Sequence, residues 1–454
     1  MDAVEKELIV QPAAEHMPSA RKVFTYFLLL GFVNIGGPVA QISMMYNYMV
    51  EQQHWLSKDR FVRIMAFAHM LPGPEALQLA IYVGYLKRGW LGGIIAGLTF
   101  IIPGALVMLV LSFLYVSYGS LPQVNDFLFI LKPAVLGIIG AGIIKLGRAA
   151  IKNAFLAALV VGAVLAMLVL GADFLVVLLL AGLLNLLFTQ GLPWLRRAPG
   201  VLPVVLAGLG GSWQQTGVLL LAGRRLQVVR AAMQQTGGLL LAGRRLQVVR
   251  AAMQQTGGLL LAAANADWLQ MAWLFLKTGL FSFGGAYASL VFLQRGAVDE
   301  FHWLTATQLL DGVALSVATP GPFMLFTTFA GYLAGGIPGA LIATFFVFLP
   351  SFVFVIAGAR YIEQLRHNRF VQAFLAGASA AVVGVILVVS IELLPGALSG
   401  TPGIPIAGMQ VGLPNILIAV VAFLAITWRK RDVALVAAAA MVLGIVYAIV
   451  HYIH

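Results

Sequence analysis

The sequence of 454 residues contains no cysteine and few charged residues. Without cysteine there is no disulfide framework, no thiolate metal site and no cysteine nucleophile. Only 10% of the residues are charged and 61% are hydrophobic, with a mean hydropathy of +0.97, whereas soluble domains have about 25% charged residues. Apolar runs of the ~20 residues needed to span a bilayer recur along the chain. The composition therefore excludes a soluble globular protein and predicts an all-α polytopic membrane protein.

Acidic residues and histidines are also scarce. Sixteen Asp and Glu stand against 28 Lys and Arg, which gives a net charge of +12, and the seven histidines are scattered. An intramembrane hydrolase or transferase would need a Ser/His/Asp set or a His/Asp metal cluster at helical spacing. We therefore expect no enzyme, no catalytic residue, no metal site and no cofactor. The Lys and Arg residues lie mostly in short loops between apolar runs, which indicates membrane orientation rather than a nucleic-acid partner.

The chain contains a long internal repeat with a shift of 248 residues, which falls to 247 where one residue drops out. The matches keep one order along both copies. They are GFVNIGGPVA (31–40) with GLFSFGGAYA (279–288), HWL (54–56) with HWL (302–304), Pro72-Gly73-Pro74 with Pro320-Gly321-Pro322, and GYL (84–86) with GYL (331–333). The sequence predicts two homologous halves, 1–195 and 265–454, joined by a linker, 196–264.

Each half is predicted to contain six apolar elements. In the first half they lie near 22–50, 60–86, 89–118, 127–147, 154–171 and 173–192. In the second half they lie near 267–293, 307–334, 337–360, 370–395, 411–428 and 433–452.

Basic clusters predict opposite orientations for the two halves. No signal peptide is predicted, because the first twenty residues lack a basic stretch followed by an apolar core, and we expect the N-terminus to be cytoplasmic beside Arg21 and Lys22. The clusters at 145–152 and 429–431 are also expected to be cytoplasmic, and counting back from the second places residue 265 outside. The halves would then be inverted-topology repeats, as in alternating-access transporters. A parallel arrangement would misplace two basic clusters rather than one.

The linker complicates this orientation. An inverted arrangement requires the linker to cross the membrane once, and the stretch long enough is 199–222, which leaves the six following arginines outside. Those arginines belong to a 20-residue repeat: QQTGVLLLAGRRLQVVRAAM at 214–233 recurs with one change at 234–253, and a third copy begins at 254. We interpret the repeat as a tolerated surface insertion. The alternative is a basic amphipathic helix on the lipid headgroups.

The first two elements of each half contain helix breakers at matched positions. Proline is disfavoured inside a helix but favoured at its first position, so each break ends one half-helix and begins another. Each half-helix of about 13 residues is roughly 20 Å long. The element either spans the membrane as a broken helix or turns back at mid-bilayer, and the charges at 58–63 favour paired re-entrant helices.

The exposed backbone N–H groups and partial positive charge of a half-helix start suit an oxyanion, and in a membrane they are tolerated where they line a polar cavity. We therefore predict a midplane site for an anion. The predicted substrate-binding residues are Gly36, Gly37, Pro38, Pro72, Gly73, Pro74, Gly284, Gly285, Pro320, Gly321 and Pro322, with Lys132 and Lys277 as charges that neutralise the anion. The alternatives are that the breakers only kink their helices and that the two lysines snorkel to the interface.

Three ionisable residues are candidates for ion coupling: Glu75, His69 and Asp311. A charge inside the membrane is costly and indicates function. Glu75 lies in the first turn of its half-helix, where it either stabilises the helix start or couples transport to protons. Arg63 and Asp311 occupy equivalent positions in the two halves, and a surface position is favoured for Arg63 over a cross-repeat ion pair.

The motifs IGGPVAQI, FGGAYASL, LPGPEALQLAIYVGY and TPGPFMLFTTFAGY resemble the signature of the chromate ion transporter (CHR) family in its two-domain long form. The resemblance implies a multi-pass protein of the bacterial inner membrane that exports chromate and confers chromate resistance, with two homologous halves of opposite topology. The three-copy linker is not part of the family pattern.

The expected partners are chromate or a sulfate-like oxyanion and the lipid bilayer, and a second copy of the chain is a further candidate. Membrane potential alone could drive export, and proton or sulfate exchange would be an addition. The main alternative is a transporter of sulfate or another divalent oxyanion, because backbone donors respond to charge and shape.

Overall fold

The computed structural model describes most of both halves of the chain. The described residues are 17–34, 38–68, 71–119, 121–191, 268–283, 285–358, 368–399, 403–406 and 409–453. Residues 1–185 and 262–454 belong to one compact unit, and 186–261 to a second. The predicted linker, with its repeats and its membrane crossing at 199–222, lies outside the described residues. So do four predicted site residues: Gly36, Gly37, His69 and Gly284.

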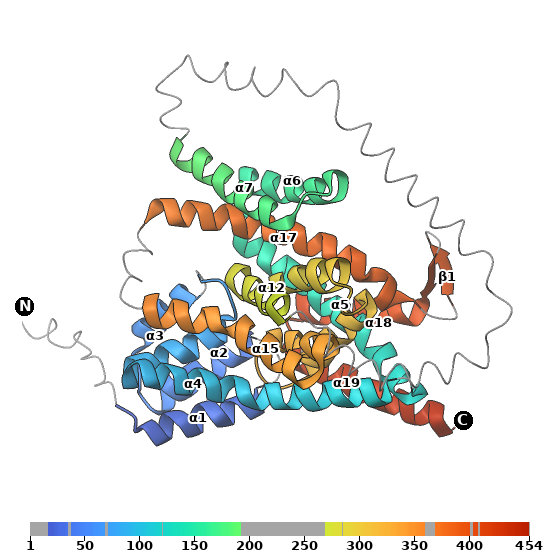
Figure 1. The fold of residues 1–454 in the computed structure, drawn as a ribbon, viewed down its shortest axis with the longest axis horizontal. Coiled ribbons are helices and arrows are strands. Elements are labelled where there is room, and N and C mark those ends of the chain that lie inside the picture. The colour runs from blue at the N-terminus through green and yellow to red at the C-terminus, as the bar shows by residue number, and fades with distance from the viewer. Residues whose placement is uncertain are drawn as a thin grey trace, which may run out of the picture. The chain divides into compact units, whose positions relative to one another are not determined.

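The first half consists of helices interrupted at the predicted breaks (Figure 1). They are α1 (Ala20–Val33), α2 (Pro38–Tyr46) continuing as the π-helix η1 (Asn47–Gln52), α3 (Lys58–Ala68), α4 (Glu75–Tyr118), α5 (Pro122–Ala150), α6 (Ala154–Leu170) and α7 (Phe174–Leu186) continuing as η2 (Leu187–Gly191).

The second half repeats this order. Its helices are α12 (Trp268–Phe281), α13 (Ala288–Phe292) continuing as η3 (Leu293–Glu300), α14 (Ala306–Ala318), the short η4 (Phe323–Leu325), α15 (Phe326–Gly358), α17 (Arg369–Leu398), α18 (Leu413–Thr427) and α19 (Val433–Ile453). The predicted breaks in the first two elements of both halves are therefore confirmed.

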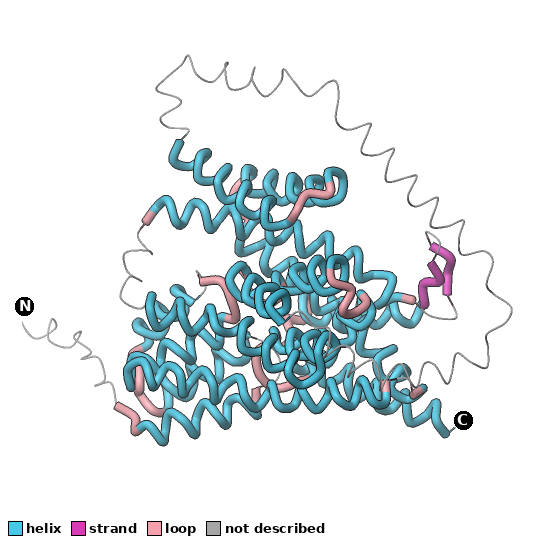
Figure 2. Tube along the Cα trace, in the orientation of Figure 1, coloured by secondary structure: helices cyan, strands magenta, loops and turns pink. Residues whose placement is uncertain are grey.

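One short β-hairpin departs from the all-α prediction (Figure 2). Strand β1 (Gly403–Ile406) pairs antiparallel with β2 (Met409–Gly412). The element expected at 411–428 begins as the end of β2, and its helix α18 starts at Leu413 with a proline in its first turn. That proline is favoured in the first turn of a helix, where its missing N–H costs nothing, so the helix starts two residues later than expected.

The long helices α4 and α15 each fold back on themselves. Arg88 and Gly89 have non-helical dihedral angles, with φ of +64° at Gly89, and Gly336 has φ of +61°. A Cβ on Gly84 would overlap the backbone of Gly92, and a Cβ on Gly331 would overlap that of Gly339. Residues eight positions apart meet only if the chain reverses between them. This confirms separate apolar elements on either side of residues 87–88 and 335–336.

The first element of each half is also a hairpin. Lys22 Nζ, at the start of α1, donates to Gln53 Oε1 just after η1 at 2.7 Å, and the rings of Tyr26 and Tyr48 stack at 3.9 Å. In the second half a Cβ on Gly296 of η3 would overlap Leu274 of α12. The two arms of each break therefore run antiparallel, as the predicted re-entrant helices require.

The two halves interlock through their later helices. α18 and α19 pack on α5 of the first half, whereas α6 packs on α17 of the second half. Small residues make both contacts close: a Cβ on Gly137 would overlap the carbonyl of Ala419, and one on Gly384 would come within 2.6 Å of the carbonyl oxygen of Val160. Gly137 and Gly384 are equivalent at the repeat shift. The contacts between the halves are thus reciprocal.

The end of the chain lies beside the start of α5. His451 Nδ1 lies 2.8 Å from Asp126 Oδ2, and the rings of Phe129 and Tyr447 stack at 5.8 Å. Helix α5 begins at Pro122 and α19 ends at Ile453, so the two helices run antiparallel.

Five helices in the described part of the chain are long and apolar enough to cross a membrane: α4, α5, α15 with η4, α17 and α19. Large apolar side chains cover outward faces, among them Val169, Leu170 and Leu417, which are 72%, 74% and 64% exposed. Such a surface is stable in lipid and not in water. The chain is a multi-pass membrane protein.

The hairpin geometry predicts which residues reach the same side of the membrane. Because the natural chain has no cysteine, single variants Lys22→Cys, Gln53→Cys and Tyr118→Cys carry one thiol each. We expect an impermeant maleimide to label the first two from one side and Tyr118→Cys from the other, since α4 crosses the bilayer between Gly89 and Tyr118. Maleimide labelling of each variant is measured in membrane vesicles of both orientations, right-side-out and inside-out. Labelling of Lys22→Cys and Gln53→Cys from opposite sides would exclude the re-entrant hairpin.

Candidate functional site

The breaks of the two halves are hydrogen-bonded to each other. The Gly73 N–H donates to the Ser282 carbonyl at 3.1 Å, and the Gly321 N–H donates to the Asn34 carbonyl at 2.9 Å. Gly73 is equivalent to Gly321, and Asn34 to Ser282, at the shift of 248. The second break of each half is thus bonded to the first break of the other half, and the fold brings the four predicted breaks together in two equivalent places.

The first junction consists of Pro72-Gly73-Pro74 with Ser282 and Ser351 of the other half. Gly73 has φ of +114°, and a Cβ there would come within 2.7 Å of Ser351 Oγ. Gln78 is buried and its Nε2 donates to the Pro72 carbonyl at 2.6 Å. Helix α4 starts directly after the break at the half-buried Glu75. This junction therefore combines a helix start with polar side chains from both halves.

The second junction consists of Pro320-Gly321-Pro322 with Asn34 and Gly104 of the first half. Gln41 Nε2 donates to the Gly321 carbonyl at 3.0 Å, and Gly321 has φ of +105°. Gly104 replaces Ser351 at the equivalent position, and a Cβ on it would overlap the carbonyl of Pro320. The backbones of the two halves touch here with no room for a side chain.

Several buried polar atoms at the junctions have no hydrogen-bond partner among the residues that the structure describes. They are both side-chain atoms of Asn34, Gln78 Oε1 and Ser351 Oγ. Asn34 is 0% exposed, and Gln78 and Ser351 are each 1% exposed. A buried polar group without a partner destabilises the fold, so these groups are available to a bound molecule. The Asn34 amide and the Ser351 hydroxyl are donors that an oxyanion accepts.

The sequence prediction missed these side chains. Asn34, Gln41, Gln78 and Ser351 were not among the predicted site residues, although each is a polar residue in an apolar run and the first three lie within a few residues of a predicted break. That pattern was the available signal. Of the predicted backbone positions, Pro38 is the first residue of α2, and Gly285, with φ of +94°, lies in the turn before α13.

Lys132 and Asp311 form a buried ion pair between the halves. Lys132 Nζ on α5 lies 2.9 Å from Asp311 Oδ1 on α14, and the Tyr115 hydroxyl on α4 donates to Asp311 Oδ2 at 2.8 Å. The Lys132 and Asp311 side chains are 17% and 3% exposed. The charge of Lys132 is therefore neutralised by the chain itself in this structure. Arg63, the equivalent of Asp311, is exposed, as predicted.

Lys277 has a different environment from Lys132. Its Nζ lies 5.7 Å from the centroid of the Trp273 ring, which is 54% exposed. This cation–π contact lies on an outward face. Lys132 and Lys277, which were predicted from the sequence to have the same role, therefore have different environments in the structure.

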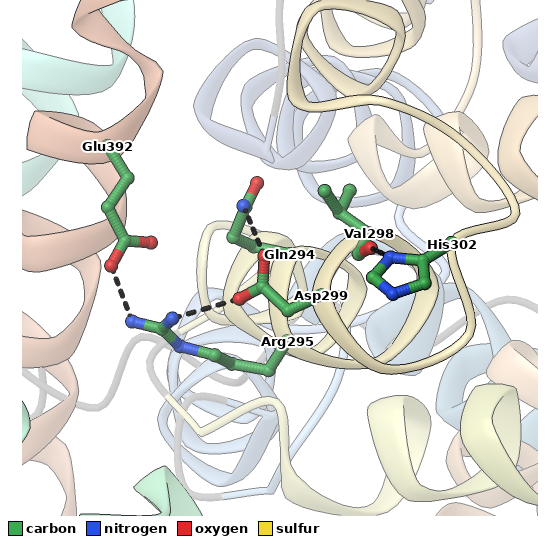
Figure 3. A network of polar contacts seen from close by, with 6 residues as sticks. All are labelled: Gln294, Arg295, Val298, Asp299, His302 and Glu392. Atoms are coloured by element: carbon green, nitrogen blue, oxygen red, sulfur yellow. Dashed lines mark hydrogen bonds and ion pairs between the residues drawn. The ribbon is translucent and has the colours of Figure 1, made fainter. Parts of the chain in front are cut away.

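A second ionic cluster lies on η3 and α17 (Figure 3). Arg295 bridges Asp299 at 2.9 Å and Glu392 at 2.6 Å, and Gln294 donates to Asp299 at 3.1 Å. The cluster joins η3 to α17, which is a structural role. Among the described residues no group of three His, Cys, Asp or Glu side chains is placed to hold a metal ion.

Comparison with known proteins gives consistent matches. The chromate transporter family model matches residues 21–186 and 269–445. The chain is 33% identical to a chromate transport protein of Pseudomonas aeruginosa over 424 residues, which cover 93% of this chain and 91% of the relative. It is 29% identical to one of Cupriavidus metallidurans over 438 residues, 95% and 94% of the two chains. A probable chromate transport protein of Synechococcus elongatus is 29% identical over 424 residues, 91% and 96% of the two chains. No solved structure matches the chain.

Gly73 and Gly321 should be harder to replace than a glycine with positive φ that has open space around it. In Gly73→Ala and Gly321→Ala the positive φ costs about 1–3 kcal/mol, and at Gly73 the new methyl group also meets Ser351. Gly171→Ala is the matched control, because Gly171 has φ of +60° and nothing within 4 Å of its Cβ position. We expect a lower unfolding temperature in detergent for both junction variants than for the control. Equal stability of all three variants would contradict the packing at the junctions.

Proposed function

The chain belongs to the chromate transporter family, and from this premise we propose that it is a secondary transporter that exports chromate across the inner membrane. The single observation that carries the mechanism is the pair of junctions, where breaks of both halves meet beside buried polar groups without partners. The substrate is proposed from the relatives, which are named as chromate transport proteins. Direction, driving force and site are argued below from the chain's own residues.

The two halves are proposed to be inverted in the membrane. α4 crosses between Gly89 and Tyr118, so α5 starts on the side opposite to Gly89. From Gly336 we count four crossings, through α15, α17, the shorter apolar helix α18 and α19, and on this count the end of α19 lies on the side of Gly336. The Asp126–His451 contact at 2.8 Å puts the end of α19 beside the start of α5. Gly89 and Gly336 are then on opposite sides, which supports inversion.

Basic residues support the same orientation. Lys87, Arg88 and the cluster 145–152 lie on the side of Gly89, and by the same count of crossings the cluster 429–431 does too. The positive-inside rule makes this side cytoplasmic. Transport by exchange between the conformations of two inverted repeats follows from such an arrangement.

The junctions are the proposed anion site. Gly104, at the second junction, is the midpoint of the α4 segment between Trp90 and Tyr118, which puts the junction near mid-bilayer. Helix starts after Pro74 and Pro322 offer N–H donors and a partial positive charge. The Asn34 amide and the Ser351 hydroxyl add donors to this set. A tetrahedral divalent oxyanion such as chromate accepts hydrogen bonds in several directions and suits these donors.

Membrane potential is sufficient as a driving force. Moving one elementary charge across 100 mV is worth about 2.3 kcal/mol, so a divalent anion leaving a negative interior gains about 4.6 kcal/mol. Glu75 adds a coupling group at the first junction, because an ionised carboxylate repels the anion and a protonated one does not. The equivalent residue in the other half is Phe323, so this coupling is confined to one junction.

Sulfate is the second candidate substrate. The junction donors respond to charge and tetrahedral shape, and sulfate has the same charge and shape as chromate. Flux assays with both anions separate the two functions.

Purified protein in proteoliposomes should move chromate under an imposed potential. We expect efflux of loaded chromate to rise when a potassium diffusion potential makes the interior negative, and to fall when the potential is reversed. Sulfate flux in the same vesicles measures selectivity. Absence of chromate flux under both the potential and a pH gradient would exclude the proposed function, and faster sulfate than chromate flux would favour the second candidate.

Replacement of Glu75 should remove the pH dependence of transport. In Glu75→Gln the side chain stays neutral at every pH, so we expect chromate flux to vary less with pH than in the natural chain. Glu392→Gln is the control, because Glu392 lies in the Arg295 cluster. An unchanged pH profile in Glu75→Gln would exclude the coupling role of this carboxylate.

A further inference from the structure

Asp311 contacts two groups of the first half, a cation and a hydroxyl, and not a cation alone. Its two carboxylate oxygens face different groups: Oδ1 forms an ion pair with Lys132 Nζ at 2.9 Å, and Oδ2 accepts a hydrogen bond from the Tyr115 hydroxyl at 2.8 Å. Both donors belong to the first half, whereas Asp311 belongs to the second. One cation and one hydroxyl, each bound to a different oxygen, form a site that other oxyanions can also occupy.

The pair is present in one copy, although the backbones of the two halves follow the same order of elements. The equivalent of Lys132 is Ser379 and the equivalent of Asp311 is Arg63, so the other half cannot form it. The arms that carry Asp311 and Arg63 also differ in burial. In α14 every residue from Leu309 to Val317 is buried, whereas in α3 Val62 is 45% exposed and Arg63 is exposed. The arm is thus buried along this whole stretch in the second half, whereas in the first half Phe61 and Ile64 are buried and Val62 and Arg63 face outward.

We propose that Lys132 and Tyr115 form an anion-binding site that the Asp311 carboxylate occupies in this structure, and that the transported divalent oxyanion takes its place during the cycle. The inference rests on the proposed function, because it assumes that a divalent oxyanion is the substrate. In this proposal Lys132 binds the substrate, and Asp311 competes with the substrate for Lys132.

Exchange at this site moves α14. A carboxylate that has lost its partners is strongly disfavoured in a buried position, so α14 leaves its place when the anion enters. α14 ends at Ala318, directly before Pro320-Gly321-Pro322, and the Ser316 hydroxyl donates to the Phe323 carbonyl beyond the break at 2.6 Å. The movement therefore reaches the second junction. Anion binding at Lys132 is coupled in this way to rearrangement of the broken helices.

Several charged residues on the elements that pack against α14 are already paired with other groups in this structure. On the elements that pack against α14, Glu392 and Arg295 bind each other, and His451 binds Asp126. Lys132 is then the cation for which substrate and Asp311 compete.

The test compares anion affinity with turnover. Binding of sulfate and of chromate to the purified, full-length protein is measured by calorimetric titration, and flux is measured in proteoliposomes. We expect Asp311→Asn to bind both anions about tenfold or more tightly, a change equal to about 1.4 kcal/mol, and to transport them more slowly. Glu392→Gln removes an ionic contact of the same kind from the Arg295 cluster and should leave affinity unchanged.

A double variant guards against misfolding of the single one. Lys132→Gln with Asp311→Asn removes both charges together, and we expect it to bind the anions about tenfold more weakly than the natural chain, a change again equal to about 1.4 kcal/mol. A purely structural ion pair would give natural affinity in the double variant and no gain in Asp311→Asn. Either result overturns the proposal.

Flux through the natural chain distinguishes a failure of the proposed Asp311 exchange from a failure of the proposed function. If the natural chain moves chromate while the variants keep natural affinity, the exchange at Asp311 is wrong and the proposed function stands. If the natural chain neither binds nor moves chromate or sulfate, both are wrong.

Discussion

A helix that breaks inside a bilayer has to satisfy its backbone without water, and the rest of this structure depends on how that is done. Lipid offers no hydrogen bonds, and each unsatisfied N–H or carbonyl is costly there. Here the N–H of Gly73 and the N–H of Gly321 are both bonded to carbonyls of the opposite half. Each half thus supplies a carbonyl that accepts a hydrogen bond from a break of the other half. The two halves are therefore needed together, and the glycines at the breaks allow the close approach that these bonds require.

The scaffold is symmetric, whereas its chemistry is not. Hairpins, folded-back helices and inter-half contacts recur at the repeat shift, and even the unusual backbone of His54 and His302, with φ of 49° and 52°, is shared. Polar and charged groups differ: Glu75 and Gln78 correspond to Phe323 and Phe326, and Asp311 corresponds to Arg63. The repeated fold gives two equivalent junctions, and the differences between the halves give each junction its own side chains.

Much of the fold followed from the repeat and from the positions of proline and glycine. The breaks before Pro74 and Pro322 and the re-entrant course of the first elements were predictable, because proline restricts the backbone locally and charge restricts which side of the membrane a loop can reach. The Lys132–Asp311 pair was not predictable. Its members are far apart in the chain and in different halves, and nothing in the local sequence pattern pairs Lys132 with Asp311. The β-hairpin at 403–412 was missed because a short strand has no long apolar run to mark it.

The sequence by itself determined that the protein lies in the membrane, that it consists of two copies of one unit, and where its helices break. These properties depend on local composition and on comparison of the chain with itself. Only the tertiary structure decided which break meets which, that Lys132 is neutralised by Asp311 while Lys277 lies over Trp273, and that the side chains of Asn34 and Ser351 and Gln78 Oε1 are buried with no hydrogen-bond partner among the described residues. The physical reason is that a charge or a hydrogen-bonding group is defined by what lies within about 3 Å of it, and packing between distant segments determines those neighbours.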